Sequence, residues 1–266
     1  MSSPLEEVKK VYKYKDSIWR IGLTDLKLKY AGSALGFFWS VLEPLLIIIV
    51  YSLVFPLILK AKFIDWVLFF ICGLIPYRFL KRGIVDLTTC LVDQRDIFNK
   101  VKILPDVIPL SKALSDSISF LLESSILVFV VLFFVKPSSY ILLFSFLFLI
   151  ELFIVLGIGF WLSCSYPKFR DLNYILNVVF EALFFLTPVV YRLSYIPELY
   201  RRVYMLNPFA RLVYLWQSII LYSSEEFIEY FPIIENMLIL FIISLIILLI
   251  GYRRFNKLKF KVIGEV

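Results

Sequence analysis

The sequence predicts an all-α integral membrane protein with six transmembrane helices. Of 266 residues, 61% are hydrophobic and the mean hydropathy is +0.88, whereas a soluble domain is nearer half apolar. Apolar stretches of about 20 residues, the length that crosses a bilayer core, alternate with short charged segments. A charged arm precedes the first stretch and a basic tail follows the last.

The hydropathy pattern divides the chain into an N-terminal arm (1–37), a six-span region (38–252) and a tail (253–266). We place the spans at about 38–59, 66–88, 108–134, 139–163, 173–191 and 233–252. The second span is the least clean, because Arg78, Lys81 and Arg82 fall in its second half. The apolar run 212–224, between the last two spans, is too short to cross. We therefore expect short re-entrant or interfacial helices there, on the external side.

Lysine and arginine predict the orientation of the chain. They gather in the arm, in the tail, and in the loops that follow the second and fourth spans. Because positively charged loops stay cytoplasmic, we expect a multi-pass protein of the cytoplasmic membrane with both termini inside. In the arm, apolar residues at helical spacing predict an amphipathic helix in the headgroup layer, with a plain charged anchor as the alternative. These residues are Val8, Tyr12, Trp19, Leu23, Leu26 and Tyr30.

Several classes of function are disfavoured by composition. The chain has no histidine, which excludes a Ser-His-Asp triad and removes the commonest metal ligand. Cys72, Cys90 and Cys164 are too scattered for a disulfide framework or a zinc site. No phosphate-binding glycine loop is present, so we expect this chain to bind no cofactor. The net charge of +7 fits orientation in a membrane, and we expect no nucleic-acid partner.

Acidic residues inside apolar spans are candidates for function. Glu123, Glu151 and Glu181 lie at membrane depth, and Glu43 and Asp116 lie nearer the span ends. An ionised group in lipid is costly, so each should face the bundle interior, a cavity or a partner such as Arg78. A hydrophilic conduit or proton path is one interpretation. A structural pair or a protonated, hydrogen-bonded acid is the other, and the sequence leaves both open.

Aromatic residues are abundant, with 27 Phe, 16 Tyr and 5 Trp. Most can be packing residues or interface anchors. Ring faces also stack on the apolar faces of sugars, so an aromatic wall suits a polysaccharide path, and the sequence does not decide between these roles. The candidates for the path, with one acidic neighbour, are Trp39, Tyr51, Phe55, Phe180, Glu181, Phe184 and Tyr191.

The loop between the second and third spans is short, charged and predicted to be cytoplasmic. We expect a short helix with exposed Ile97 and Phe98 ringed by charge, which suits docking into a groove of another protein. An ordinary solvated loop is the alternative. The candidate docking residues are Arg95, Asp96, Ile97, Phe98, Asn99 and Lys100.

Six short motifs follow one another in a distinctive order. They are Asp25 to Trp39 with Pro44, Lys100 to Ser111, Phe169 to Leu172, Thr187 to Tyr191, Ile196-Pro197, and Leu206 to Phe209. Together they resemble the permease subunit of type-2 ATP-binding cassette (ABC) exporters. The resemblance is greatest to the branch that exports O-antigen, capsular polysaccharide and teichoic acid.

This resemblance implies a homodimer of permeases, each docked on a separate cytoplasmic ATPase that binds the ATP and magnesium. It implies that residues 95–100 lie in or beside the helix received by that ATPase, and that residues 192–232 fold back as short helices near the exit. It also implies that a lipid-linked glycan passes between the protomers.

Other functions stay open at this stage. An exporter of drugs or lipids could share the same fold. An intramembrane enzyme acting on lipid-linked sugars would need clustered acidic residues. A proton-coupled carrier could use Glu123, Glu151 and Glu181.

Overall fold

The computed structural model describes residues 9–100, 103–135, 139–222 and 230–265, and these residues form helices and turns without a strand. The α-helices are α2 (Lys15–Lys29), α3 (Trp39–Ile58), α4 (Phe63–Asp93), α5 (Arg95–Lys100), α6 (Val107–Phe134), α7 (Phe144–Ser163), α8 (Leu172–Phe185), α9 (Glu198–Tyr204), α10 (Pro208–Leu221) and α11 (Ile233–Glu265). Short 3-10 turns precede α3, α7 and α9.

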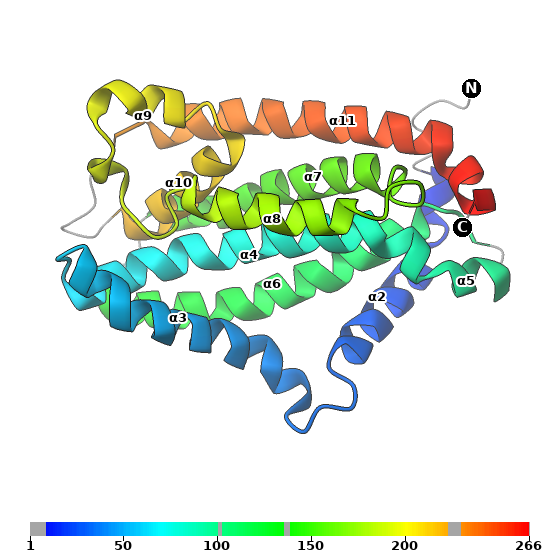
Figure 1. Ribbon diagram of the computed structural model, residues 1–266, viewed down its shortest axis with the longest axis horizontal. Helices are drawn as coiled ribbons and strands as arrows, with labels where there is room; N and C mark the ends of the chain where they lie inside the picture. Colours follow the sequence, from blue (N-terminus) through cyan, green and yellow to red (C-terminus); the bar gives the residue numbers. More distant parts are fainter. Residues whose placement is uncertain (1–8, 101–102, 136–138, 223–229, 266) are drawn as a thin grey trace.

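The long helices lie side by side along one axis, with α4, α6, α7 and α11 forming the bundle (Figure 1). Helix α3 packs less closely against the bundle than these four helices do, and it leans away from them toward α2. Helices α9 and α10 lie at one end. Helix α2 begins, and α11 finishes, at the opposite end, where α5 also lies.

Five helical segments of the described residues are long and apolar enough to cross a membrane: Gly36–Ile58, Phe63–Asp93, Val107–Val131, Ser139–Ser163 and Ile233–Gly264. They include the predicted first, second, third, fourth and sixth spans. The predicted fifth span, 173–191, is not confirmed, because α8 has 14 residues and ends at Phe185. That length rises about 21 Å, less than the roughly 30 Å of a bilayer core. The turn that ends α8 includes Thr187-Pro188, and a residue before proline disfavours the helical conformation.

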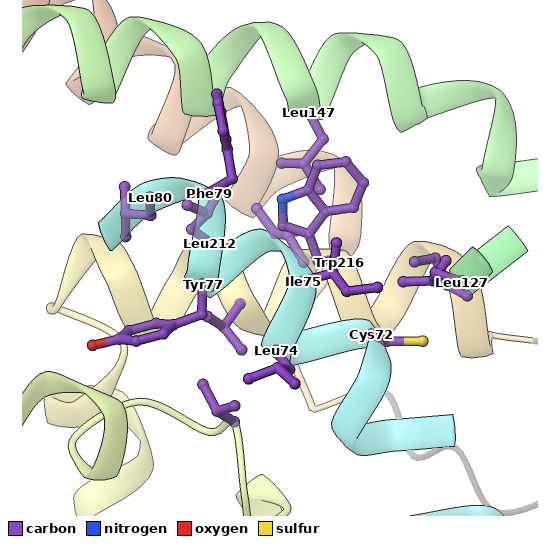
Figure 2. Packing of buried hydrophobic residues seen from close by; sticks show 14 of the residues in the cluster. Cys72, Leu74, Ile75, Tyr77, Phe79, Leu80, Leu127, Leu147, Leu212 and Trp216 are labelled. Atoms are coloured by element: carbon purple, nitrogen blue, oxygen red, sulfur yellow. The ribbon is translucent and has the colours of Figure 1, made fainter. Parts of the chain in front are cut away.

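Helix α4 is the centre of the apolar core. Its Trp66, Phe70, Phe79 and Leu80 are fully buried, between α6, α7 and α10. Trp216 of α10 packs in the same core, where Figure 2 shows its indole beside Leu147 of α7. These side chains are excluded from lipid as well as water, so the bundle is held by packing and not by membrane insertion alone.

Small residues let α7 and α11 approach closely, as the glycine pair within the fourth span suggests. A Cβ atom added to Gly251 would lie 1.9 Å from the carbonyl oxygen of Gly157. A Cβ atom added to Gly159 would meet Leu87 of α4 at 2.5 Å. Gly157 therefore faces α11 and Gly159 faces α4, and neither contact leaves room for a larger residue.

The segment between α8 and α11 forms the short helices expected there. Asn207 caps α10 by accepting a hydrogen bond from the backbone N–H of Phe209, at 3.0 Å. The turn before α9 is tied to its neighbours by two hydrogen bonds: Trp66 Nε1 donates to the carbonyl of Val190 at 3.0 Å, and Gln217 Nε2 donates to that of Pro188 at 2.7 Å. Helix α10 is almost entirely buried, so it is an integral part of the bundle.

The N-terminal arm forms a helix, but α2 packs on protein as well as facing outward. Gly22 lies close to Leu114 of α6, and Leu26 is buried. Tyr12 and Trp19 stay largely exposed, in keeping with a headgroup location. Val8 lies outside the described residues.

At the other terminus the basic tail continues α11 without a break. Its Lys259 is buried and donates to the carboxylate of Asp106 at 2.7 Å, and Tyr252 donates to the same carboxylate at 3.2 Å. Phe255 is fully buried next to Phe160. The tail therefore packs under the bundle beside the start of α6.

Candidate functional site

A cavity of about 430 Å³ opens between α3, α4 and α8. Four of the seven predicted path residues line it: Tyr51, Phe180, Glu181 and Phe184. The structure adds Ile47, Leu74, Tyr77, Arg78, Lys81 and Phe185. We call this space the aromatic cavity. Its wall combines ring faces with two cations and one exposed carboxylate.

Stacked rings shape the wall of the aromatic cavity. The ring of Tyr51 stacks on Phe70 at 5.2 Å and meets Phe184 edge-on at 5.8 Å. Tyr77 meets Phe184 at 5.4 Å, and its hydroxyl donates to the backbone carbonyl of Phe180. Such contacts hold the rings in fixed orientations. A ligand in the cavity therefore meets ring faces held by their neighbours, with the side chains of Arg78, Lys81 and Glu181 beside them.

The other three predicted path residues lie outside this cavity. Trp39 begins α3 and is about one-third exposed. Phe55 packs against Tyr51 and Trp66 and supports the wall from behind. The Tyr191 hydroxyl is hydrogen-bonded to the carbonyl of Phe185 at 2.7 Å and to the Tyr204 hydroxyl at 2.8 Å, so it fixes the turn after α8.

A second cavity of about 480 Å³ adjoins the first, and Arg78 and Lys81 line both. We call it the charged cavity. Its remaining lining residues are Lys29, Tyr30, Glu43, Arg82, Val85, Asp86 and Asn177. Burial raises the pKa of Tyr30 above its usual value of about 10, at which the hydroxyl is already a hydrogen-bond donor at neutral pH. The two cavities meet at Arg78 and Lys81, and their linings differ, one charged and the other largely aromatic.

An ion-pair network forms one side of the charged cavity. Arg82 contacts the buried carboxylate of Glu123 at 2.5 Å and that of Asp116 at 3.5 Å. Arg78 contacts Glu43 of α3 at 3.1 Å and Glu123 at 3.5 Å. Paired geometry of this kind offsets the desolvation of buried charges. It also joins α3, α4 and α6.

The same network reaches the N-terminal helix. Lys29 lies 3.7 Å from Asp116 and 3.9 Å from Asp86. Lys112 of α6 lies 3.0 Å from Asp25 and 3.5 Å from Asp86. Helix α2 is thus joined through charges to α4 and α6, in addition to its apolar contacts.

These contacts place each acidic residue that the sequence singled out. Glu123, Asp116 and Glu43 are in ion pairs, and Arg78 is indeed a partner of Glu43 and Glu123. Glu151 is fully buried and accepts a hydrogen bond from Trp216 Nε1 at 2.9 Å. Glu181 alone of the three at membrane depth is exposed in a cavity.

Sequence reasoning missed Lys81 and Arg82 as cavity residues. They had appeared only as irregularities in the second span. The signal was their spacing, because residues 78, 81 and 82 fall on one face of a helix. A single sequence does not show which other helices pack against the face of α4 that carries these residues.

The predicted docking segment forms the short helix α5. The side chains of Arg95 and Asp96 are 61% and 79% exposed. Ile97 and Phe98, predicted to be exposed, are half-buried against a cluster that includes Ile108 and Phe255. The prediction of exposed side chains was wrong in this respect, because both residues pack against this cluster. The side chains of Asn99 and Lys100 lie outside the described residues.

A groove of about 480 Å³ lies beside α5, between α2 and the end of α4. Its apolar residues include Ile21, Leu28 and Ile97, and Asp93 and Asp96 also line it. Among the described residues no three Cys, Asp or Glu side chains lie close enough to hold a metal ion.

Comparison with known proteins identifies the family. Over 239 residues the chain is 26% identical to the O-antigen export system permease protein RfbA of Klebsiella pneumoniae, covering 89% of this chain and 90% of that protein. It is 29% identical over 215 residues to RfbA of Myxococcus xanthus, covering 80% and 83%. It is 23% identical over 221 residues to the polysialic acid transport protein KpsM of Escherichia coli, covering 79% and 84%.

The resemblance drawn from the sequence motifs is confirmed by a match to a whole family. The match covers residues 17–221, from α2 to the end of α10. It confirms a transporter permease and not an enzyme, and it implies a membrane location and association with an ATPase subunit. The chain belongs to the ABC-2 type transporter family.

Proposed function

We propose that this chain is the membrane permease of an ATP-driven exporter that moves a lipid-linked polysaccharide across the cytoplasmic membrane. The observation that carries the proposal is the pair of adjoining cavities. A charged cavity leads into one walled by Tyr51, Tyr77, Phe180 and Phe184. Ring faces bind sugars without selecting one hydroxyl pattern, which suits a repeating polymer. The named relatives export O-antigen or transport polysialic acid, and the chain covers most of their length.

The transporter is proposed to work as a homodimer. The face of α3 carries exposed apolar residues, including Ile49, Leu53 and Leu57, and α8 exposes Ile175 and Val178. Both helices border the aromatic cavity. Two copies meeting through these faces would enclose the cavities between them, whereas one copy leaves them open at the side.

Six crossings with both termini cytoplasmic are the topology we propose. The start of α2 and the finish of α11 lie at the same end of the bundle, which an even number of crossings requires (Figure 1). Helix α8 and the turn after it supply the fifth crossing in this scheme. Helices α9 and α10 then lie near the external exit. The clustering of Lys and Arg toward the α5 end supports its cytoplasmic location.

Two copies of a cytoplasmic ATPase are proposed to drive transport through α5. The exposed Arg95 and Asp96 and the adjoining groove offer a charged rim and an apolar floor for docking. ATP-driven movement of the partner would shift the permease between conformations through its contacts with this end. This chain itself is proposed to bind no nucleotide, magnesium or other cofactor.

Reconstitution with the ATPase tests the function. The permease is purified with the candidate ATPase in nanodiscs, and ATP turnover is measured with and without lipid-linked polysaccharide. We expect stimulation by the polymer and none by small drugs or by phospholipid. Equal stimulation by drugs or phospholipid would identify the alternative exporter of the same fold. Conversion of lipid-linked sugars by the isolated chain would identify an enzyme and refute the proposal.

A further inference from the structure

Lys81 lines both the charged and the aromatic cavity. Its cationic neighbours Lys29, Arg78 and Arg82 each have a carboxylate within 4.0 Å. Across the described parts of the chain, Lys81 has no such ion-pair partner. Its side chain is partly buried, and the two cavities that it lines give a ligand access to it.

A lysine that lines a cavity and has no carboxylate within 4.0 Å can bind an anion there, because its charge is free to form a charge-assisted hydrogen bond. Glu181 also lines the aromatic cavity, but it is exposed and forms no ion pair with Lys81. The carboxylates that share the charged cavity are already engaged. Glu43 pairs with Arg78, and Asp86 pairs with Lys29 and Lys112. The hydroxyl of Tyr30 lines the same cavity and adds a neutral hydrogen-bond donor.

We propose that Lys81 binds the phosphate ester of the transported glycolipid, at the junction between the two cavities. This inference rests on the proposed export of a lipid-linked polysaccharide and assigns the recognition of its charged group. A phosphate held at Lys81 places the attached sugar next to the rings of Tyr51 and Phe184.

The type of residue also suits a ligand that must leave again. Lysine binds phosphate as a point charge, whereas the arginine fork forms paired, directional bonds. Arg78 and Arg82 use their forks on Glu43, Glu123 and Asp116 and so shape the wall. Lys81 is left to hold an anion without locking its orientation.

The test measures lipid binding to the permease–ATPase complex by native mass spectrometry. The probes are undecaprenyl phosphate, undecaprenol without the phosphate, and phosphatidylglycerol. We expect Lys81→Gln to weaken binding of undecaprenyl phosphate about tenfold or more, since it removes a charged hydrogen bond. Binding of undecaprenol should not change, and Lys81→Arg should retain most of the affinity. Lys257→Gln, which removes an exposed lysine of α11, is the matched control and should behave as wild type.

Unchanged affinity in Lys81→Gln would overturn the inference, as would an equal loss for undecaprenol or for the control. An equal dependence of phosphatidylglycerol on Lys81 would assign the site to bulk lipid headgroups and overturn its role with substrate. If Lys81→Gln does not fold, the same comparison is made with Lys81→Arg and Tyr30→Phe, where only the second should weaken phosphate binding. Stimulation of ATP turnover by the polymer in the wild type tests the proposed function separately, so each can fail while the other holds.

Discussion

The contact between α7 and α11 allows a sharp prediction about stability. A Cβ atom at position 251 would lie 1.9 Å from the carbonyl oxygen of Gly157 and 2.7 Å from its carbonyl carbon. Carbon and oxygen atoms of neighbouring helices normally approach to about 3.3–3.6 Å. Gly251→Ala therefore forces the two helices apart by roughly 1.5 Å at this point, given that normal separation. The atoms that the new Cβ would meet belong to the backbone of α7, so no flexible side chain can move aside to relieve the contact.

Overpacking of this kind typically costs about 1–3 kcal/mol, and rigid backbone on both sides places this site at the upper end. We expect Gly251→Ala to lower the free energy of unfolding by about 3 kcal/mol. That corresponds to a fall in melting temperature of roughly 6–12 °C for a chain of this size. The assay is thermal unfolding of the purified permease in detergent, followed by intrinsic fluorescence.

Gly264→Ala is the matched control, because Gly264 lies in the same helix and a Cβ atom there would meet nothing within 4 Å. Alanine is the better helix former by about 1 kcal/mol, so the control should be neutral or more stable. A melting temperature of Gly251→Ala equal to that of wild type would refute the packing argument. An equal fall in the melting temperature of both variants would also refute it, since that would mean that any glycine-to-alanine change in α11 destabilises the protein.

Three further predictions concern other parts of the chain. Lys259→Met leaves the buried carboxylate of Asp106 without its main partner and should destabilise the protein by about 3–5 kcal/mol, measured as a lower melting temperature. Adding Asp106→Asn should recover part of this loss, and an unchanged melting temperature in Lys259→Met would contradict the pairing. Arg95→Glu should leave the permease folded but reduce its coupling to the ATPase, and unchanged polymer-stimulated turnover would argue against docking at α5. Glu181→Gln removes the exposed carboxylate of the aromatic cavity and should lower transport, so full transport would count against a conduit role for this residue.

The fold was predictable to the extent that one-dimensional hydropathy determines it. Long apolar runs gave five crossing helices nearly in place, because lipid imposes both length and helicity. The predicted fifth span, 173–191, differed because α8 ends before Thr187-Pro188, although the residues that follow remain apolar. The tail after residue 252 was predicted as a separate segment on its charges. A hydropathy pattern does not show that a helix continues through charged residues such as Lys259, because it carries no information about ion-pair partners that lie elsewhere in the chain.

The site was predictable by residue type and less so by pairing. Tyr51, Phe180 and Phe184 were identified because aromatic residues on two spans can form a common wall. Lys81 became a candidate only when the structure showed two cavities sharing it. The partners of a charge depend on which helix faces meet, and contacts such as Lys259 with Asp106 join residues far apart in the chain.

The location of the ion-pair network favours a role in the cavity over one in stability alone. Replacing a buried pair with well-packed apolar residues is often neutral or stabilising, so stability does not account for keeping Arg82 against Glu123. In lipid, charged side chains are tolerated chiefly where they face the bundle interior or a water-filled space. Arg78 and Arg82 meet that condition, because each has one side on the charged cavity and the other on buried Glu123. The carboxylates hold a cationic wall in place, and that wall borders the proposed path, where Lys81 has no ion-pair partner among the residues that the structure describes.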